Sequence, residues 1–146
     1  MEKTLQQRTV HWQAAQAAVV AAQEKAAELG LRVCASISDR GGNAVAFLRH
    51  PAAPLHTSDI ASDKAVTAAS FGFPTTEWMA FIESNNSAGL RAGIVNRDRL
   101  VVFGGGLPLY HDGELVGGIG VSGGSEEEDE ICARAGVVAA QLSESP

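Results

Sequence analysis

Two histidines close together in the sequence are the clearest candidates for chemistry in this chain. His50 and His56 flank a loop that Pro51 and Pro54 stiffen, because each proline ring fixes the backbone φ. A pre-organised pair of neutral imidazoles can ligate iron or another metal, or transfer protons. Two surface-loop histidines without a function are the alternative interpretation, and the sequence leaves both open.

Lys64 stands out because it interrupts an apolar stripe with steps of four, three and four: Ile60, Lys64, Thr67 and Phe71. A lysine among small and apolar neighbours can have a lowered pKa and act as a base, or it can pair with an anionic group of a ligand. Alternatively, its ammonium reaches solvent or pairs with Asp39 or Asp63. We expect Lys64 to face a ligand site and to contribute charge there rather than fold stability.

Glycines gather in two segments, Gly104-Gly105-Gly106 and the run from Gly117 to Gly124. Glycine weakens a strand, but it allows close approach by a helix, a partner subunit or a flat ligand. The backbone amides of Gly123, Gly124 and Ser125, at a helix start, could hold a carboxylate or propionate. The acidic residues 126–128 argue against a strongly anionic ligand there.

The remaining candidates are isolated along the chain. His11 lies early in the first expected helix and could contact a cofactor that lies against it, whereas His111 sits in a tight turn and is expected to be exposed. Cys34 and Cys132 are expected to be buried thiols, with a disulfide as the alternative. No zinc, P-loop or dinucleotide-binding spacing occurs.

Local signals predict the elements that must position these residues. Helices are expected at 12–29, 57–70, around Trp78 and from Ser125 onward, where Ser125 and Glu128 have capping-box spacing. Strands are expected at 31–38, 44–49, 100–103, 107–110 and 114–122, with hairpin turns at 39–43 and 112–113. Residues 84–99 are expected to form a loop with one helical turn. Pro108 favours an edge strand.

This order predicts a mixed α/β (α+β) domain over residues 1–146, with a five-stranded, mainly antiparallel sheet flanked by helices. A net charge of −6 and a pI near 5.1 disfavour a nucleic-acid partner. No apolar run reaches the length of a membrane helix, and the first residues lack a signal core, so a cytoplasmic location is expected.

Four ordered motifs carry a resemblance to a known family: residues 37–43, residues 63–71 with Pro74-Thr75, residues 104–109, and residues 116–124 with Asp129 following. With them the chain resembles the GlcG/HbpS family of haem-binding and haem-degrading proteins, related to the C-terminal domain of PduO-type proteins. The resemblance implies a profilin-like subunit that assembles into a homo-oligomer. Some members bind haem, and others belong to small-molecule catabolic operons.

Three functions are therefore considered. The first is an oligomeric small-ligand-binding protein for haem or a related flat cofactor. In that function His11, His50 or His56 is the axial ligand. The wall of the site contains Phe71 and the glycines at 104–106 and 123–124. The second is a lyase, isomerase or metal-assisted enzyme in which His50 or His56 transfers protons or binds a divalent metal and Lys64 neutralises a developing charge. The third is a structural or regulatory oligomer with no ligand.

Overall fold

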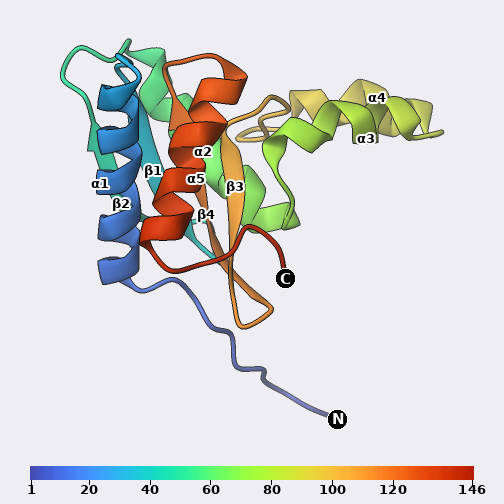
Figure 1. Cartoon of the computed structure of the whole chain (residues 1–146). Coiled ribbons are helices and arrows are strands. Elements are labelled where there is room, and N and C mark those ends of the chain that lie inside the picture. Colours follow the sequence, from blue (N-terminus) through green and yellow to red (C-terminus); the bar gives the residue numbers. More distant parts are fainter.

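The computed structural model describes residues 1–146 and centres on one antiparallel sheet, whose strand order is β2-β1-β4-β3. The strands are β1 (Cys34–Asp39), β2 (Ala44–Arg49), β3 (Gly106–His111) and β4 (Glu114–Ser122). Helices α1 (Trp12–Glu28) and α5 (Glu126–Ala139) lie side by side on one face (Figure 1), and α2 (His56–Phe71) packs against β4, β1 and β3 from the other. Four short helices join α2 to β3: η1 (Thr75–Glu77), α3 (Trp78–Ser84), α4 (Ala88–Gly93) and η2 (Ile94–Asn96).

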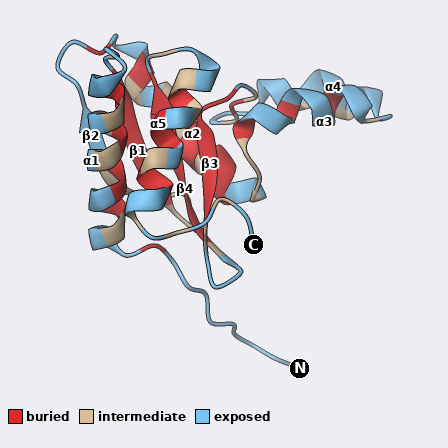
Figure 2. Cartoon of the chain, in the orientation of Figure 1, coloured by how far each residue is buried: buried red, intermediate tan, exposed pale blue.

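The main core lies between the sheet and the pair α1 and α5, and it follows from alternation along the strands. Successive strand residues point to opposite faces, so the larger apolar side chains share one face. Figure 2 shows the buried residues concentrated in the strands and on the inner sides of the helices. This core contains Ala18, Ala22, Ile37, Leu107, Leu109, Ile119, Val121 and Val137.

The opposite face of the sheet is built from very small residues, and α2 packs on it at backbone distance. A Cβ added at Gly118 would lie 2.2 Å from the Ala65 carbonyl oxygen, and one at Gly120 would lie 2.0 Å from the Ala61 carbonyl oxygen. The buried residues of α1 are mostly alanines, and they allow a similarly close approach by α5. A Cβ at Gly136 of α5 would lie 2.7 Å from the Ala18 carbonyl oxygen. The glycines and alanines therefore allow close helix packing on both faces.

The ends of several elements are those that the sequence predicts. The Ser125 hydroxyl accepts from the Glu128 N–H while the Glu128 carboxylate accepts from the Ser125 N–H, which confirms the capping box. Gly30, with φ 72°, ends α1, and the Leu31 N–H reaches the Ala26 carbonyl. Pro108 lies in the edge strand β3, as expected.

Three expectations about secondary structure are wrong. The sheet has four strands, not five, because residues 100–103 make no ladder: the Val101 N–H is taken by the Thr67 hydroxyl of α2. Thr57 or Ser58, which the sequence offers as the cap of the second helix, does not cap it: α2 begins at His56 with no side-chain cap, and the Thr57 hydroxyl donates instead to the Pro54 carbonyl oxygen (2.6 Å). The expected loop at 84–99 contains both α4 and η2.

Helices α3 and α4 project from the body and are mostly exposed (Figures 1 and 2). Cys34 and Cys132 are free, buried thiols, as expected. None of the helices has the length and apolar character needed to cross a membrane.

Candidate ligand-binding site

A hollow of about 350 Å³ opens where the N-terminal segment meets the turn between β3 and β4. It brings together two imidazoles and a guanidinium, those of His11, His111 and Arg8. Apolar side chains form much of the remaining wall: Val10, Ala14, Val116, Ala140 and Leu142. The combination of nitrogen donors, one cation and an apolar wall is typical of a small-ligand site.

The N-terminal segment is held in place by bonds to the sheet. The Val10 N–H donates to the Val116 carbonyl oxygen (2.9 Å), and the Thr9 hydroxyl accepts from the Arg40 N–H (3.1 Å). These bonds lay residues 9 and 10 along the start of β4, immediately before α1. Arg8 and His11, on either side, are thereby fixed at the rim of the hollow.

His11 also begins α1. Its Nδ1 accepts a hydrogen bond from the Gln13 N–H (3.3 Å), so the ring serves as the N-cap. When Nδ1 accepts, the hydrogen of the neutral ring is assigned to Nε2. A ligand that needs an unprotonated Nε2 must therefore displace this cap.

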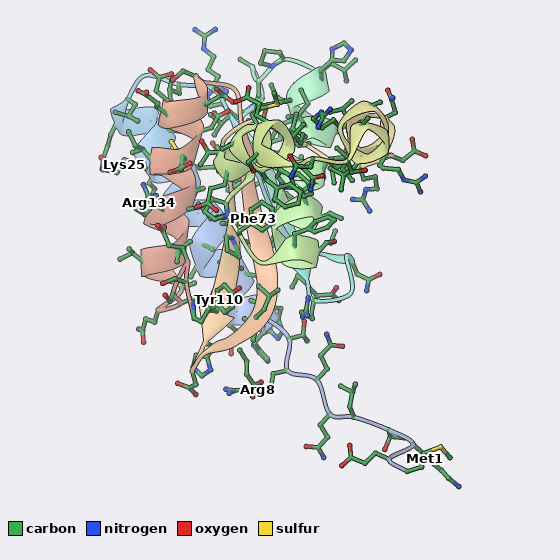
Figure 3. All side chains as sticks on the ribbon, turned by 90° about the vertical axis from the view of Figure 1, so that its right-hand side faces the viewer. Met1, Arg8, Lys25, Phe73, Tyr110 and Arg134 are labelled. Carbon is green, nitrogen blue, oxygen red and sulfur yellow. The ribbon has the colours of Figure 1, made fainter.

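His111 reaches the hollow from the end of β3. The following turn has positive φ at Asp112 (50°) and Gly113 (80°), the geometry that a two-residue hairpin requires. Arg8 hydrogen-bonds to His111 Nδ1 and lies 3.5 Å from the Asp112 carboxylate. Figure 3 shows Arg8 near the lower end of this hairpin, from where the chain runs outward to Met1.

Only one of the residues singled out in the sequence as cofactor-binding, His11, lines this hollow. His50 is exposed, and its Nδ1 accepts from the Ala52 N–H (3.0 Å) within its own loop. His56 is exposed at the first turn of α2. Lys64 lies eight positions after His56 along α2, about 12 Å of helix rise. Neither histidine hydrogen-bonds to Lys64, so the structure does not join these three residues into one site.

Lys64 is buried and paired, with 1% of its side chain exposed. Its Nζ donates to the Asp129 carboxylate (2.9 Å) and to the Val121 carbonyl oxygen (2.8 Å). Burial lowers the pKa of Lys64, and the Asp129 charge opposes that change. Burial likewise raises the pKa of Asp129, against the opposing effects of Lys64 and of the Gly124 N–H. The alternatives in which the Lys64 ammonium reaches solvent or pairs with Asp39 or Asp63 are therefore wrong. That Lys64 faces a ligand site stays a prediction.

The glycines expected at a ligand wall face protein atoms. A Cβ at Gly105 would lie 2.6 Å from Lys64 Nζ, and one at Gly106 would lie 2.6 Å from the Thr75 methyl group. The Gly104 N–H donates to the Glu126 carboxylate (2.8 Å). A Cβ added at Gly123 would lie too close to the Arg32 carbonyl oxygen, and one added at Gly124 would lie too close to the Glu128 side chain. These glycines make packing contacts, and a direct contact with a ligand stays a prediction.

Phe71 belongs to an aromatic cluster at the other end of α2. Its ring meets Trp78 edge-on with centroids 4.8 Å apart, and Phe73 and Phe81 extend the cluster.

No group of three or more His, Cys, Asp or Glu side chains lies close enough together to hold a metal ion.

Two residues of the hollow were missed as ligand-binding candidates in the sequence. Arg8 carries no local signal, and His111 lies in a tight turn that predicts only exposure. They meet across 103 positions of the chain, because the β3–β4 turn folds back beside the N-terminal segment. No local pattern predicts that contact.

Related sequences among the known proteins include one of nearly the same length as this chain and two named proteins. The chain is 36% identical over 134 residues to an uncharacterized 15.0 kDa protein in the dhaT–dhaS intergenic region of Citrobacter freundii, covering 91% of this chain and 93% of that one. It is 37% identical over 120 residues to the corrinoid adenosyltransferase PduO of Salmonella typhimurium, covering 82% of this chain but only 35% of PduO. It is 31% identical over 110 residues to the Escherichia coli K12 protein GlcG, covering 75% and 78%.

Solved structures agree with these relationships. Klebsiella pneumoniae protein ORFY superposes with a TM-score of 0.87 at 34% identity, covering 97% of both chains. A PduOC–haem complex superposes with a TM-score of 0.85 at 32% identity, covering 94% of this chain and 99% of that one. HbpS gives 0.81 at 32% identity, covering 93% of both chains.

The family model for the HbpS-like haem-degrading proteins matches residues 10–138, from the segment that lines the hollow to the end of α5. Together with the GlcG and PduO relatives, this match confirms the resemblance derived from the four glycine-rich and helical motifs. The chain belongs to the HbpS-like family of haem-degrading proteins.

Proposed function

We propose that this chain binds haem at the hollow beside α1, with His11 as the axial ligand, and that it does so as a homo-oligomer. The observation that carries the proposal is that His11, His111 and Arg8 line one hollow with an apolar wall. A neutral imidazole is a common axial ligand of haem iron, and an arginine can pair with a propionate. The haem complex of a relative supports the choice of ligand.

The donor set fits haem better than a bare metal ion. One or two imidazoles are enough for haem, whose porphyrin supplies the other ligands, whereas a bare ion needs a larger protein donor set. Apolar contacts from Val10, Ala14 and Leu142 suit a porphyrin face. Bound haem would supply redox-active iron, and the protein residues would hold and orient it.

Binding through His11 has a local consequence for α1. Iron needs a lone pair on the imidazole, and Nδ1 accepts from the Gln13 N–H while Nε2 carries the hydrogen. Ligation through Nε2 would require that hydrogen to move to Nδ1, and the cap would then be lost. Haem binding is therefore expected to loosen the first turn of α1.

The hollow alone, at about 350 Å³, lies at the small end of ligand sites. Haem is larger than most ligands of such sites, so part of it would stay exposed on a single chain. A second copy is the simplest cover for that part, which is why we propose an oligomer. Light scattering during the titration described next measures the assembly directly.

Titration with hemin tests the proposal. The wild-type chain should give a sharp Soret shift, and His11→Asn should abolish it, because asparagine keeps a side-chain cap for α1 but is a poor iron ligand. Arg8→Gln should weaken binding while keeping the shifted spectrum.

The variants His50→Ala and His56→Ala are matched controls, since both histidines are exposed and outside the hollow. They should bind hemin as the wild type does. A Soret shift that survives His11→Asn and disappears in either control would contradict the assignment of the site. A spectrum like that of free hemin in the wild type as well as in every variant would show that the chain does not bind haem.

A further inference from the structure

A second hollow, of about 320 Å³, lies on the far side of α2 from the sheet. Its walls are the outer surface of α2 and the segment that follows α4. Nine residues line it: Val66, Thr67, Ser70, Phe71, Ile94, Arg97, Asp98, Arg99 and Leu100. The hollow described above lies beside α1, on the other face of the sheet, and the two share no residue.

The loop that closes this hollow is firmly attached to α2. The buried Thr67 hydroxyl accepts from the Val101 N–H (3.0 Å) and lies 3.0 Å from the Arg99 carbonyl oxygen. Arg99 Nε donates to the Asp63 carboxylate (3.0 Å). These bonds hold Arg99 at φ 62°, a left-handed conformation that a residue other than glycine rarely adopts. Such strain persists where the surroundings enforce it, often at ligand sites.

The attachment leaves one cation of the hollow unpaired. Arg99 is neutralised by Asp63, whereas the Arg97 side chain has no hydrogen bond and no ion pair. A guanidinium with five free donors in a planar fork matches a carboxylate in two parallel bonds. Asp98 lines the same hollow, so a second negative charge on the ligand would be repelled.

The rest of the wall is suited to an apolar body. Phe71 is 49% exposed although it is aromatic, and its ring lines the hollow with Val66, Ile94 and Leu100. A cavity of about 150 Å³ already binds benzene, so the hollow has room for a ring and a carboxylate. The Ser70 hydroxyl, also on the wall, can donate to the second carboxylate oxygen.

We propose that this hollow binds a small monocarboxylate with an aromatic or branched apolar body, whose carboxylate pairs with Arg97 and whose body packs on Phe71. The site is independent of haem binding. Phe71, which the sequence predicts to contact a cofactor, would then contact the monocarboxylate in the hollow at α2 rather than haem in the hollow beside α1.

Calorimetric titration with phenylacetate, benzoate and 3-methylbutanoate tests the proposal on the intact chain. At least one should bind saturably, and Arg97→Gln should weaken that binding tenfold or more. Arg97→Lys keeps the charge but not the planar fork, so it should retain part of the affinity. The neutral amide of the best ligand should bind as weakly to the wild type as the acid does to Arg97→Gln.

Arg32→Gln is the matched control, since Arg32 is an exposed arginine outside the hollow and without a side-chain bond. It should leave the affinity unchanged. Because Arg97 is exposed and unpaired, its variants should melt with the wild type, so a loss of binding is not a loss of fold. Saturable binding that is unchanged in Arg97→Gln, or no saturable binding of any of the three acids, would overturn the proposal.

Discussion

Replacing Lys64 by methionine keeps the length and apolar stem of the side chain but removes its ammonium. Asp129, whose side chain is 4% exposed, then loses its charged partner and keeps backbone hydrogen bonding, including the bond from the Gly124 N–H (2.8 Å). A carboxylate in that position cannot stay charged without a large desolvation penalty. We expect it to take up a proton in the folded state instead.

The size of the effect follows from the cost of that proton. The usual pKa of an aspartate is 3.8. In the unfolded chain Asp129 is therefore ionised at pH 7, which lies roughly three units above that pKa. Each unit is about 1.4 kcal/mol, which sets a ceiling of about 4 kcal/mol on the loss of stability. This agrees with the roughly 3–5 kcal/mol typical for a broken buried pair. At pH 4.5 the same reasoning leaves about 1 kcal/mol.

Urea unfolding followed by circular dichroism, at pH 7 and at pH 4.5, measures both values. The melting temperature at pH 7 should fall by at most roughly 8–16 °C, because the ceiling of about 4 kcal/mol corresponds to about 2–4 °C per kcal/mol for a chain of this size. The sign is fixed by linkage. Burial raises the pKa of Asp129 already in the wild-type fold, and loss of the Lys64 charge should raise it further. The stability of the variant should therefore decline as the pH rises from 3.8 toward that raised pKa.

The double variant Lys64→Met/Asp129→Asn is the control. The asparagine oxygen can still accept from the Gly124 N–H and carries no charge, so most of the lost stability should return. A Lys64→Met variant as stable as the wild type at pH 7, or one equally destabilised at both pH values, would refute the reasoning. It would mean that Asp129 is solvated in the variant or that packing, rather than charge, dominates.

Two further predictions concern groups in and beside the main core. Burial raises the pKa of Cys132 from 9.0 to about 11, so the folded chain keeps this proton longer than the unfolded chain. Stability should then fall as the pH rises from 9 to 11, by up to about 3 kcal/mol, and Cys132→Ala should show less of this loss in alkaline urea titrations. Gly120→Ala would place a Cβ 2.0 Å from the Ala61 carbonyl oxygen; we expect a loss of about 3 kcal/mol or more, whereas Gly93→Ala, with open space around it, should be neutral or slightly stabilising. Equal stability of Gly120→Ala and Gly93→Ala would show that α2 can move away from β4 at little cost.

Much of the fold is determined by signals that act over a few residues. The turn at Asp112-Gly113, the glycine end of α1 at Gly30 and the capping box at Ser125 each depend on local backbone geometry, and each occurs where the sequence predicts it. The glycines of β4 also predict that another part of the molecule or a ligand packs closely on this strand, because any other residue would place a Cβ in that space. The sequence left open what would fill it, and the structure shows that α2 does.

Tertiary structure decided the rest, because partners distant in sequence are chosen by register and packing. Lys64 and Asp129 are 65 positions apart, so the apolar stripe around Lys64 could indicate an unusual lysine but not its partner. Residues 100–103 have strand propensity, yet Thr67 of α2 takes the Val101 N–H that a ladder would need. His11, His111 and Arg8 meet only because the antiparallel pairing of β3 and β4 returns the hairpin to the N-terminal segment. Local sequence therefore specifies the elements and their close contacts, whereas the candidate sites arise from contacts between elements, whose energies depend on the whole assembled sheet.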